Sequence, residues 1–160
     1  MFGINLPNLG DRNHRVTSEM TPRYNCISWS VREDLISLWP DDDNRWPTSV
    51  TREESMDAFL QFYTMIGFER ISLNAIHYEP GYEKIALYAD TAGPCHAARQ
   101  IPSGRWLSKL GRLADIEHND LNCLEGGAYG NVVAIFKRLD TGSPPALPPL
   151  FPDRPLIILP

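Results

Sequence analysis

The chain has 160 residues, of which 42% are hydrophobic, and this size predicts a single domain with one core. Its formal net charge is −5, without a cluster of lysine and arginine, which argues against a nucleic-acid or anionic-membrane surface because phosphate binding needs a concentrated basic patch. No stretch approaches the roughly 20 apolar residues of a membrane span and residues 1–10 do not resemble a secretory signal, so we expect a cytoplasmic protein whose partner is a protein or peptide.

The chain is expected to open with an irregular arm and to continue into a helix. Turn-forming residues without periodicity predict the arm over residues 1–24. A helix of about 13 residues should begin at Asn25 and end before Pro40, since proline disfavours helical backbone in the residue that precedes it. The apolar positions of this helix recur at helical spacing: Ile27, Val31, Leu35 and Leu38.

A second helix is indicated by a capping box, in which Thr51 and Glu54 each satisfy a free backbone donor. An apolar stripe follows, and Gly67 stands where a left-handed residue commonly ends a helix. The period then falls to two, which predicts strands separated by short glycine-containing turns. These predicted strands cover residues 68–73, 82–90, 96–101, 105–110 and 131–137, with a short helical turn over 112–118.

The predicted fold class is α+β, with N-terminal helices packed on a four- to five-stranded antiparallel sheet. Short connections favour antiparallel neighbours, so the strands between residues 82 and 110 are expected to form a meander. The domain is expected over residues 25–139. Seven of the fourteen prolines fall in residues 140–160, which predicts an irregular, polyproline-like tail because proline supplies no N–H to a ladder.

Cysteine and histidine carry the candidate chemistry. The three cysteines, Cys26, Cys95 and Cys123, match no zinc template and cannot all pair, so we expect neither a disulfide framework nor a metal or other cofactor. Cys26 falls in the first turn of the first predicted helix, where free N–H groups and the helix dipole favour a thiolate. His96 opens a strand after a glycine-proline turn and is the histidine best placed to accept and return a proton. Either residue alone is more often structural, so the pairing carries the hypothesis.

Several motifs resemble an uncharacterised, mainly bacterial domain family that reads YNCIAWA, HAARQ, GRWTSKLG and IEH. The corresponding segments are YNCISWS at 24–30, HAARQ at 96–100, GRWLSKLG at 104–111 and IEH at 116–118. The order of helix with cysteine, then strand with histidine, is more loosely similar to papain-like cysteine hydrolases of the NlpC type. This second resemblance implies a papain-like arrangement, a cysteine nucleophile, a histidine base, and a polar residue on the next strand that orients the histidine.

The residue at that orienting position is Ser108, and serine is a weak orienter. A three-residue turn before its strand would place Ser108 on the face of His96, whereas a two-residue turn would bring Lys109 there instead. Two carboxylates are rival candidates: Asp90 and Asp115.

Other residues are candidates for binding the oxyanion or the substrate. The Asn25 side chain could cap the first helix or stabilise an oxyanion beside the first backbone N–H groups. Gln100 shares the face of the histidine and could bind substrate. Trp29 and Trp106 could line a cleft, although packing in the core is the commoner role of such side chains.

Two classes of function compete. The leading hypothesis is a cysteine hydrolase or acyl transferase of the peptidase, amidase or deamidase class, in which Cys26 attacks an acyl group and His96 shuttles the proton. The alternative is a non-catalytic protein-binding module of the immunity or adaptor type, in which both residues are structural. The chain is compatible with being part of a larger effector. Substrate choice lies in loops and pocket shape, so the sequence selects neither the bond attacked nor the oligomeric state.

Overall fold

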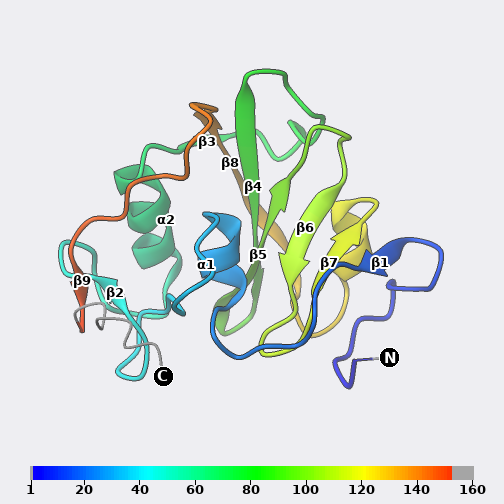
Figure 1. Cartoon of the computed structure of the whole chain (residues 1–160), viewed down its shortest axis with the longest axis horizontal. Coiled ribbons are helices and arrows are strands. Elements are labelled where there is room, and N and C mark those ends of the chain that lie inside the picture. The colour runs from blue at the N-terminus through cyan, green and yellow to red at the C-terminus, as the bar shows by residue number, and fades with distance from the viewer. Residues whose placement is uncertain (1, 153–160) are drawn as a thin grey trace.

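A computed structural model gives the fold and describes residues 2–152. Its central feature is a seven-stranded antiparallel sheet with the strand order β1-β7-β6-β5-β4-β8-β3 (Figure 1). A second, two-stranded antiparallel sheet pairs β2 with β9. The strands are β1 (His14–Val16), β2 (Trp46–Pro47), β3 (Glu69–Ile71), β4 (Tyr82–Asp90), β5 (Gly93–Gln100), β6 (Trp106–Lys109), β7 (Asp115–His118), β8 (Asn131–Leu139) and β9 (Leu150–Phe151).

Two α-helices, α1 (Cys26–Ser30) and α2 (Met56–Met65), cover one face of the large sheet. Figure 1 shows α1 in front of β4 and β5, with α2 beyond it on the side of β3. Neither helix within residues 2–152 has the length and apolar character that crossing a bilayer requires. The apolar cluster beneath them, here called the helix-side core, includes Ile27, Trp46, Phe59, Phe62, Tyr63, Ile85, Leu87, Ala97 and Phe136.

The opposite face of the sheet packs a second apolar cluster, here called the far-side core. It is covered by the N-terminal arm and by a 3-10 helix, η1 (Leu121–Leu124). Alternate residues of β4 divide between the two clusters, as the period of a strand requires: Ile85 and Leu87 face the helices, whereas Ala86 and Tyr88 face the other way. The far-side core further includes Ala98, Trp106, Leu110, Ile116, Leu121, Leu124 and Ile135.

The predicted fold class is wrong. We expected N-terminal helices on a four- to five-stranded sheet in a papain-like arrangement, but the described residues form nine strands, seven of them in one sheet, and only two short α-helices. Two short strands on one side of the sheet account for much of the difference, because β1 falls in the predicted arm and β7 replaces the predicted helical turn. Strands of three or four residues carry too few alternating positions to be distinguished from a turn.

The first helix is also much shorter than predicted. It ends at Ser30, where the N–H of Val31 bonds to the Ser28 carbonyl at 3.1 Å and the chain turns through Arg32 in the left-handed region at φ 61°. The later apolar residues still reach the core, since Ile36 and Leu38 are buried on irregular backbone. Their spacing therefore reflects burial and not a continuous helix.

The second helix was predicted with the right end and the wrong beginning. Its N-cap is Ser55, whose hydroxyl accepts a hydrogen bond from the Ala58 N–H at 3.2 Å, and not Thr51. Gly67 follows the helix with φ 101°, in the left-handed conformation expected at this position.

The predicted meander is confirmed, because β4 pairs with β5 and β5 pairs with β6, both antiparallel. The predicted irregular segments contain some regular structure: β1 lies within residues 1–24, and β9 within residues 140–160. The last part of the predicted tail, residues 153–160, lies outside the described residues.

Candidate active site

Cys26 is the first residue of α1, and a reciprocal capping box fixes the start of this helix. The Asn25 side-chain oxygen accepts a hydrogen bond from the Ser28 N–H at 3.0 Å, while the Ser28 hydroxyl accepts one from the Asn25 N–H at 2.9 Å. The Asn25 amide nitrogen donates to the Leu38 carbonyl at 2.8 Å. Both ends of this amide are thus engaged, so Asn25 acts as the helix cap and holds the position of the neighbouring thiol.

The Cys26 sulfur lies against the backbone of β5. It is 3.9 Å from the carbonyl oxygen of Cys95 and also interacts with the backbone N–H of Ala97, the two residues that flank His96. The ladder between β5 and β6 stops at the pair Ala98–Ser108, although β5 itself extends back to Gly93. The sulfur therefore occupies the opening at the edge of β5 where β6 has diverged.

His96 is completely buried on the far side of the sheet, opposite Tyr88 in the register. Its ring is stacked on Tyr129, with centroids 4.1 Å apart and an interplanar angle of 8°, and it meets the Tyr88 ring edge-on at 5.3 Å. These two rings restrict the imidazole to one orientation.

A chain of hydrogen bonds determines which nitrogen of each buried histidine carries the proton. The Asp120 carbonyl can only accept, so His118 Nδ1 donates to it at 2.8 Å. The bare Nε2 of His118 then accepts from the Ser108 hydroxyl at 2.8 Å, and Ser108 Oγ accepts from His96 Nε2 at 3.0 Å. We call this chain the histidine relay.

The relay leaves His96 Nδ1 without a proton. This nitrogen is buried and has no hydrogen-bond partner within residues 2–152. Nδ1 is therefore free to accept a hydrogen bond. Because buried polar atoms normally have a partner, this unpartnered nitrogen is a candidate for a functional role.

Burial sets the protonation states of the candidate pair. It raises the pKa of Cys26 to about 11 and lowers the pKa of His96 well below 6.5, so both groups are neutral at pH 7. Burial lowers the pKa of His118 to about 4 as well. The expected thiolate is therefore not favoured, because desolvation outweighs a helix dipole that only five residues supply.

The thiol and the imidazole are not hydrogen-bonded to each other in the part of the chain that the structure describes. Cys26 packs with the helix-side core, while His96 extends to the opposite face. A direct contact between the sulfur and His96 Nδ1 thus stays a prediction.

A cavity of about 580 Å³ gives access to the thiol. This volume lies within the roughly 300–1,000 Å³ of small-ligand pockets. We call it the thiol cleft; the residues around it include Tyr24, Asn25, Cys26, Trp39, Cys95 and Arg112. Within residues 2–152 no group of three or more His, Cys, Asp or Glu side chains is arranged to hold a metal ion.

Ser108 lies where the three-residue turn before its strand was expected to place it. The pair Ala98–Ser108 places the serine on the face of His96, where their hydrogen bond forms. The rival orienters have other partners: Asp90 accepts from the Ala92 N–H, the Lys109 ammonium donates to backbone carbonyls that include those of Thr21 and Gly111, and Asp115 accepts from the Tyr24 hydroxyl.

The other predicted binding residues lie away from the thiol cleft. Trp29 is stacked between Tyr24 and the Arg99 guanidinium, with separations of 5.3 and 4.8 Å. Trp106 is buried in the far-side core, and the Gln100 amide donates to the carbonyls of Ile76 and Gly104. The structure does not bring these three side chains to Cys26.

His118 is the member of the relay that sequence reasoning missed. It was placed at the end of a predicted helical turn, but it lies in β7 opposite Trp106. The sequence signal that could have identified it is the segment 116–118. If this segment is a strand, its side chains alternate between the two faces, so His118 lies on the same buried face as Ile116.

Comparison with known proteins supports the expectation of an uncharacterised domain family and gives no support to the papain-like resemblance. The model of a family described as a domain of unknown function, DUF7689, matches residues 15–137. No curated protein and no solved structure matches the chain. Because the family match covers well over half of its length, the chain belongs to the DUF7689 family.

Proposed function

We propose that this chain is a cysteine hydrolase or acyl transferase, with Cys26 as the nucleophile and His96 as the general base. The observation that carries the proposal is the set of hydrogen bonds around His96, from which its tautomer follows. The histidine relay directs its only N–H to Ser108 and leaves Nδ1 as a buried, unpartnered acceptor. Holding an imidazole in one tautomer through its second nitrogen is how a general base is oriented.

The proposed reaction begins from a neutral pair. The Cys26 sulfur attacks an acyl carbon, a sulfur–carbon bond forms, and the thiol proton passes to His96 Nδ1. The imidazolium then returns this proton to the leaving amine, alcohol or thiol as its bond to the acyl carbon breaks. Attack by water on the thioester completes a hydrolysis, and attack by a second amine, alcohol or thiol completes a transfer.

The start of α1 supplies donors for the oxyanion. The backbone N–H groups of Cys26 and Ile27 interact with the sulfur in the resting state, so they lie where the developing oxyanion would form. The proposal assigns that role to these backbone groups and not to Asn25, whose amide caps the helix. The thiol cleft, at about 580 Å³, has the volume of a small-ligand pocket, which supports a substrate group of that size at the thiol.

One observation favours a second candidate, the non-catalytic binding module. Cys26 is only 6% exposed, His96 is 0% exposed, and no hydrogen bond joins them. Under this alternative the relay only satisfies buried polar groups. The two candidates differ in whether His96 affects the chemistry of the thiol.

Acyl transfer to the thiol from p-nitrophenyl acetate distinguishes the two candidates. The full chain is incubated with the ester at pH 7, and acetylation of each cysteine is followed by mass spectrometry. We expect acetylation at Cys26, none at this position in Cys26→Ser, and a rate lowered about 10²- to 10⁴-fold in His96→Gln. Cys95→Ser is the matched control, because Cys95 lines the same cleft and should leave the Cys26 rate unchanged.

Buried Cys123 reports on folding in the same experiment. A variant that unfolds will expose all three thiols, so acetylation of Cys123 identifies loss of structure. An equal Cys26 rate in folded wild type and folded His96→Gln would contradict the enzyme and support the binding module.

A further inference from the structure

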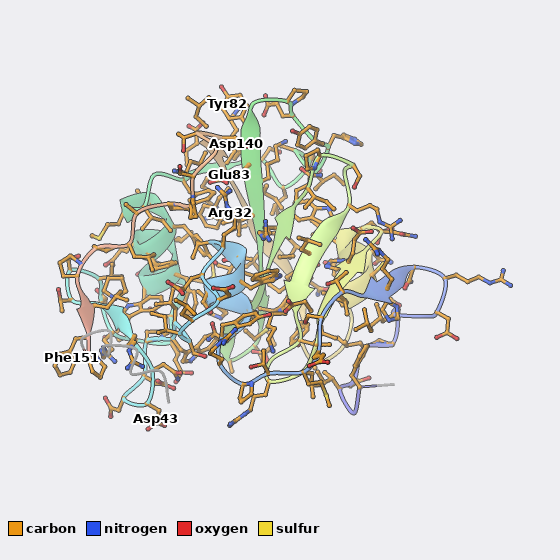
Figure 2. The ribbon with its side chains drawn as sticks, viewed as in Figure 1. Arg32, Asp43, Tyr82, Glu83, Asp140 and Phe151 are labelled. Carbon is orange, nitrogen blue, oxygen red and sulfur yellow. The ribbon has the colours of Figure 1, made fainter. Side chains whose placement is uncertain are left out.

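A second cavity, of about 170 Å³, lies at the opposite end of α1 from Cys26. Residues at the end of α1 contribute one wall, and β4, β5 and the segment after β8 contribute the others. In Figure 2 the labelled residues Tyr82, Asp140, Glu83 and Arg32 follow one another from the top of β4 towards α1. We call this cavity, with Arg32 and Arg99 in its lining, the arginine pocket.

Arg99 lacks the partner that a largely buried cation usually has. Its guanidinium stacks on the Trp29 ring at 4.8 Å, and its Nε is buried without a hydrogen-bond acceptor. Within residues 2–152 none of its N–H groups makes a hydrogen bond or an ion pair with the protein. A guanidinium carries five donors in a planar fork that matches carboxylate and phosphate oxygens.

The neighbouring carboxylates compensate the charge of Arg99 only in part, since burial and the charge of Arg32 lower its pKa by more than Glu83 and Asp115 raise it. Two carboxylates line the pocket, and both have partners: Glu83 pairs with Arg32 and Arg138, and Asp140 accepts a hydrogen bond from the Gly142 N–H. Lys84, also in the lining, donates to backbone carbonyls of the loop before β4 and lies 3.9 Å from a Glu79 carboxylate oxygen, so its charge is largely engaged. Burial, together with the positive charge of Arg32, lowers the pKa of Arg99 to about 10, so the pocket disfavours this charge in the absence of an anion.

Arg32 contributes a second independent observation. It is the non-glycine residue with a positive φ within residues 2–152, at 61°, a conformation that side chains rarely adopt and that clusters at functional sites. Its Nη2 donates to Glu83 at 2.9 Å and to the Ser143 carbonyl at 2.8 Å, which holds the side chain at the pocket. The strained backbone therefore places a second cation beside Arg99.

We propose that the arginine pocket binds an oxyanion, the phosphate or carboxylate group of a small ligand, through the Arg99 guanidinium with Arg32 beside it. The volume sets the size of the group, because a cavity of about 150 Å³ holds one benzene-sized molecule. The pocket is separate from the thiol cleft, so this proposal does not depend on the chemistry of Cys26.

Two anions distinguish the sources of the oxyanion: inorganic phosphate and N-acetylglycine, a small carboxylate. Each is titrated into the full chain at constant ionic strength set by sodium chloride, while the arginine Nε–H signals and the melting temperature are followed. We expect one of the two to shift the Arg99 Nε–H signal saturably and to raise the melting temperature in the same concentration range, because ligands that bind the folded state stabilise it.

Three variants complete the test. Arg99→Gln should lose the saturable rise in melting temperature, while Arg12→Gln, the same change at an exposed arginine outside the pocket, should keep it. Arg99→Lys keeps the charge without the fork and should bind at least tenfold more weakly, since an ammonium donates from a single point. An equal response in Arg99→Gln and wild type, or a response to both anions no larger than to chloride, would overturn the proposal.

Discussion

The two faces of the large sheet bury their residues in different ways. On the helix side Ala97 packs among aliphatic and aromatic side chains such as Phe62, and the polar atoms there are few. On the far side the residue before it, His96, belongs to a row of buried polar groups that continues through Ser108 and His118. Strand β5 thus separates an apolar core from the histidine relay. We infer that the apolar core is the main source of stability, whereas the relay determines which ring nitrogens of His96 and His118 carry a proton.

The largest effect should come from the apolar face. Phe62 is 0% exposed and stacks on Trp46 at 4.8 Å, so Phe62→Ala removes contacts on all sides and leaves a cavity. We expect the free energy of unfolding to fall by about 3–5 kcal/mol, as for other buried phenylalanines. Urea denaturation measures this loss. A change below about 1 kcal/mol would show that the helix-side core is not the main source of stability.

The polar face should give a pH-dependent effect of intermediate size. His118 has a pKa of about 4 in the folded chain against 6.5 ordinarily, so the unfolded chain binds more protons between these values. Its contribution is complete above about pH 6.5 and is lost as the pH falls towards 4, on the order of 3 kcal/mol in all. The same burial of His96 acts in the same direction.

Urea denaturation between pH 7 and 4.5 tests this sign. The slope of stability against pH should be smaller in His118→Gln, while His77→Gln, a change at an exposed histidine, should leave the slope as in wild type. A stability that rises as the pH falls from 6.5 would mean that the histidines are charged in the fold.

A smaller effect compares one serine from each face. Ser108→Ala removes the hydroxyl that joins two imidazoles and leaves ring nitrogens without partners, which should cost about 1–3 kcal/mol. Ser30, on the helix side, donates to the Ile27 carbonyl at 2.6 Å and bonds to the Tyr63 hydroxyl at 2.8 Å, so Ser30→Ala is a matched loss of a buried hydroxyl.

The two serine variants differ in their effect on the thiol. Only Ser108→Ala should change the acetylation rate of Cys26, because only Ser108 contacts His96. If both variants lower that rate equally, the relay has no special role in orienting the base.

The sequence predicted the long central strands better than the elements around them. The bounds of β4 were predicted correctly, because a long strand lies between two turns that the sequence marks, Pro80-Gly81 before it and Ala92-Gly93 after it. The end of α1 at Ser30 was not predicted, since irregular backbone buries Ile36 and Leu38 at a spacing that also suits a helix. The edge strand β1 pairs only with β7, about a hundred residues later in the chain, and a local sequence pattern does not reveal such a pairing.

The candidate site was predicted in part for the same reasons. Ser108 was proposed from its distance after His96, and the choice between it and Lys109 depended on a turn length that the sequence left open and the register of β5 with β6 decides. His118 required the position of β7, and the neutrality of Cys26 required the depth of burial, neither of which is a local property. The unpartnered guanidinium of Arg99 is likewise visible only when the lining of the arginine pocket is known.

The most direct test of the central claim is the tautomer of His96, read from two-bond ¹H–¹⁵N correlations of the imidazole rings at pH 7. Samples of wild type and His96→Gln assign the signals. The account predicts a neutral His96 ring with the proton on Nε2 and none on Nδ1, and a neutral His118 with its proton on Nδ1. A proton on His96 Nδ1, in either the other neutral tautomer or the imidazolium, would leave no acceptor for the Cys26 thiol and would contradict the proposed function.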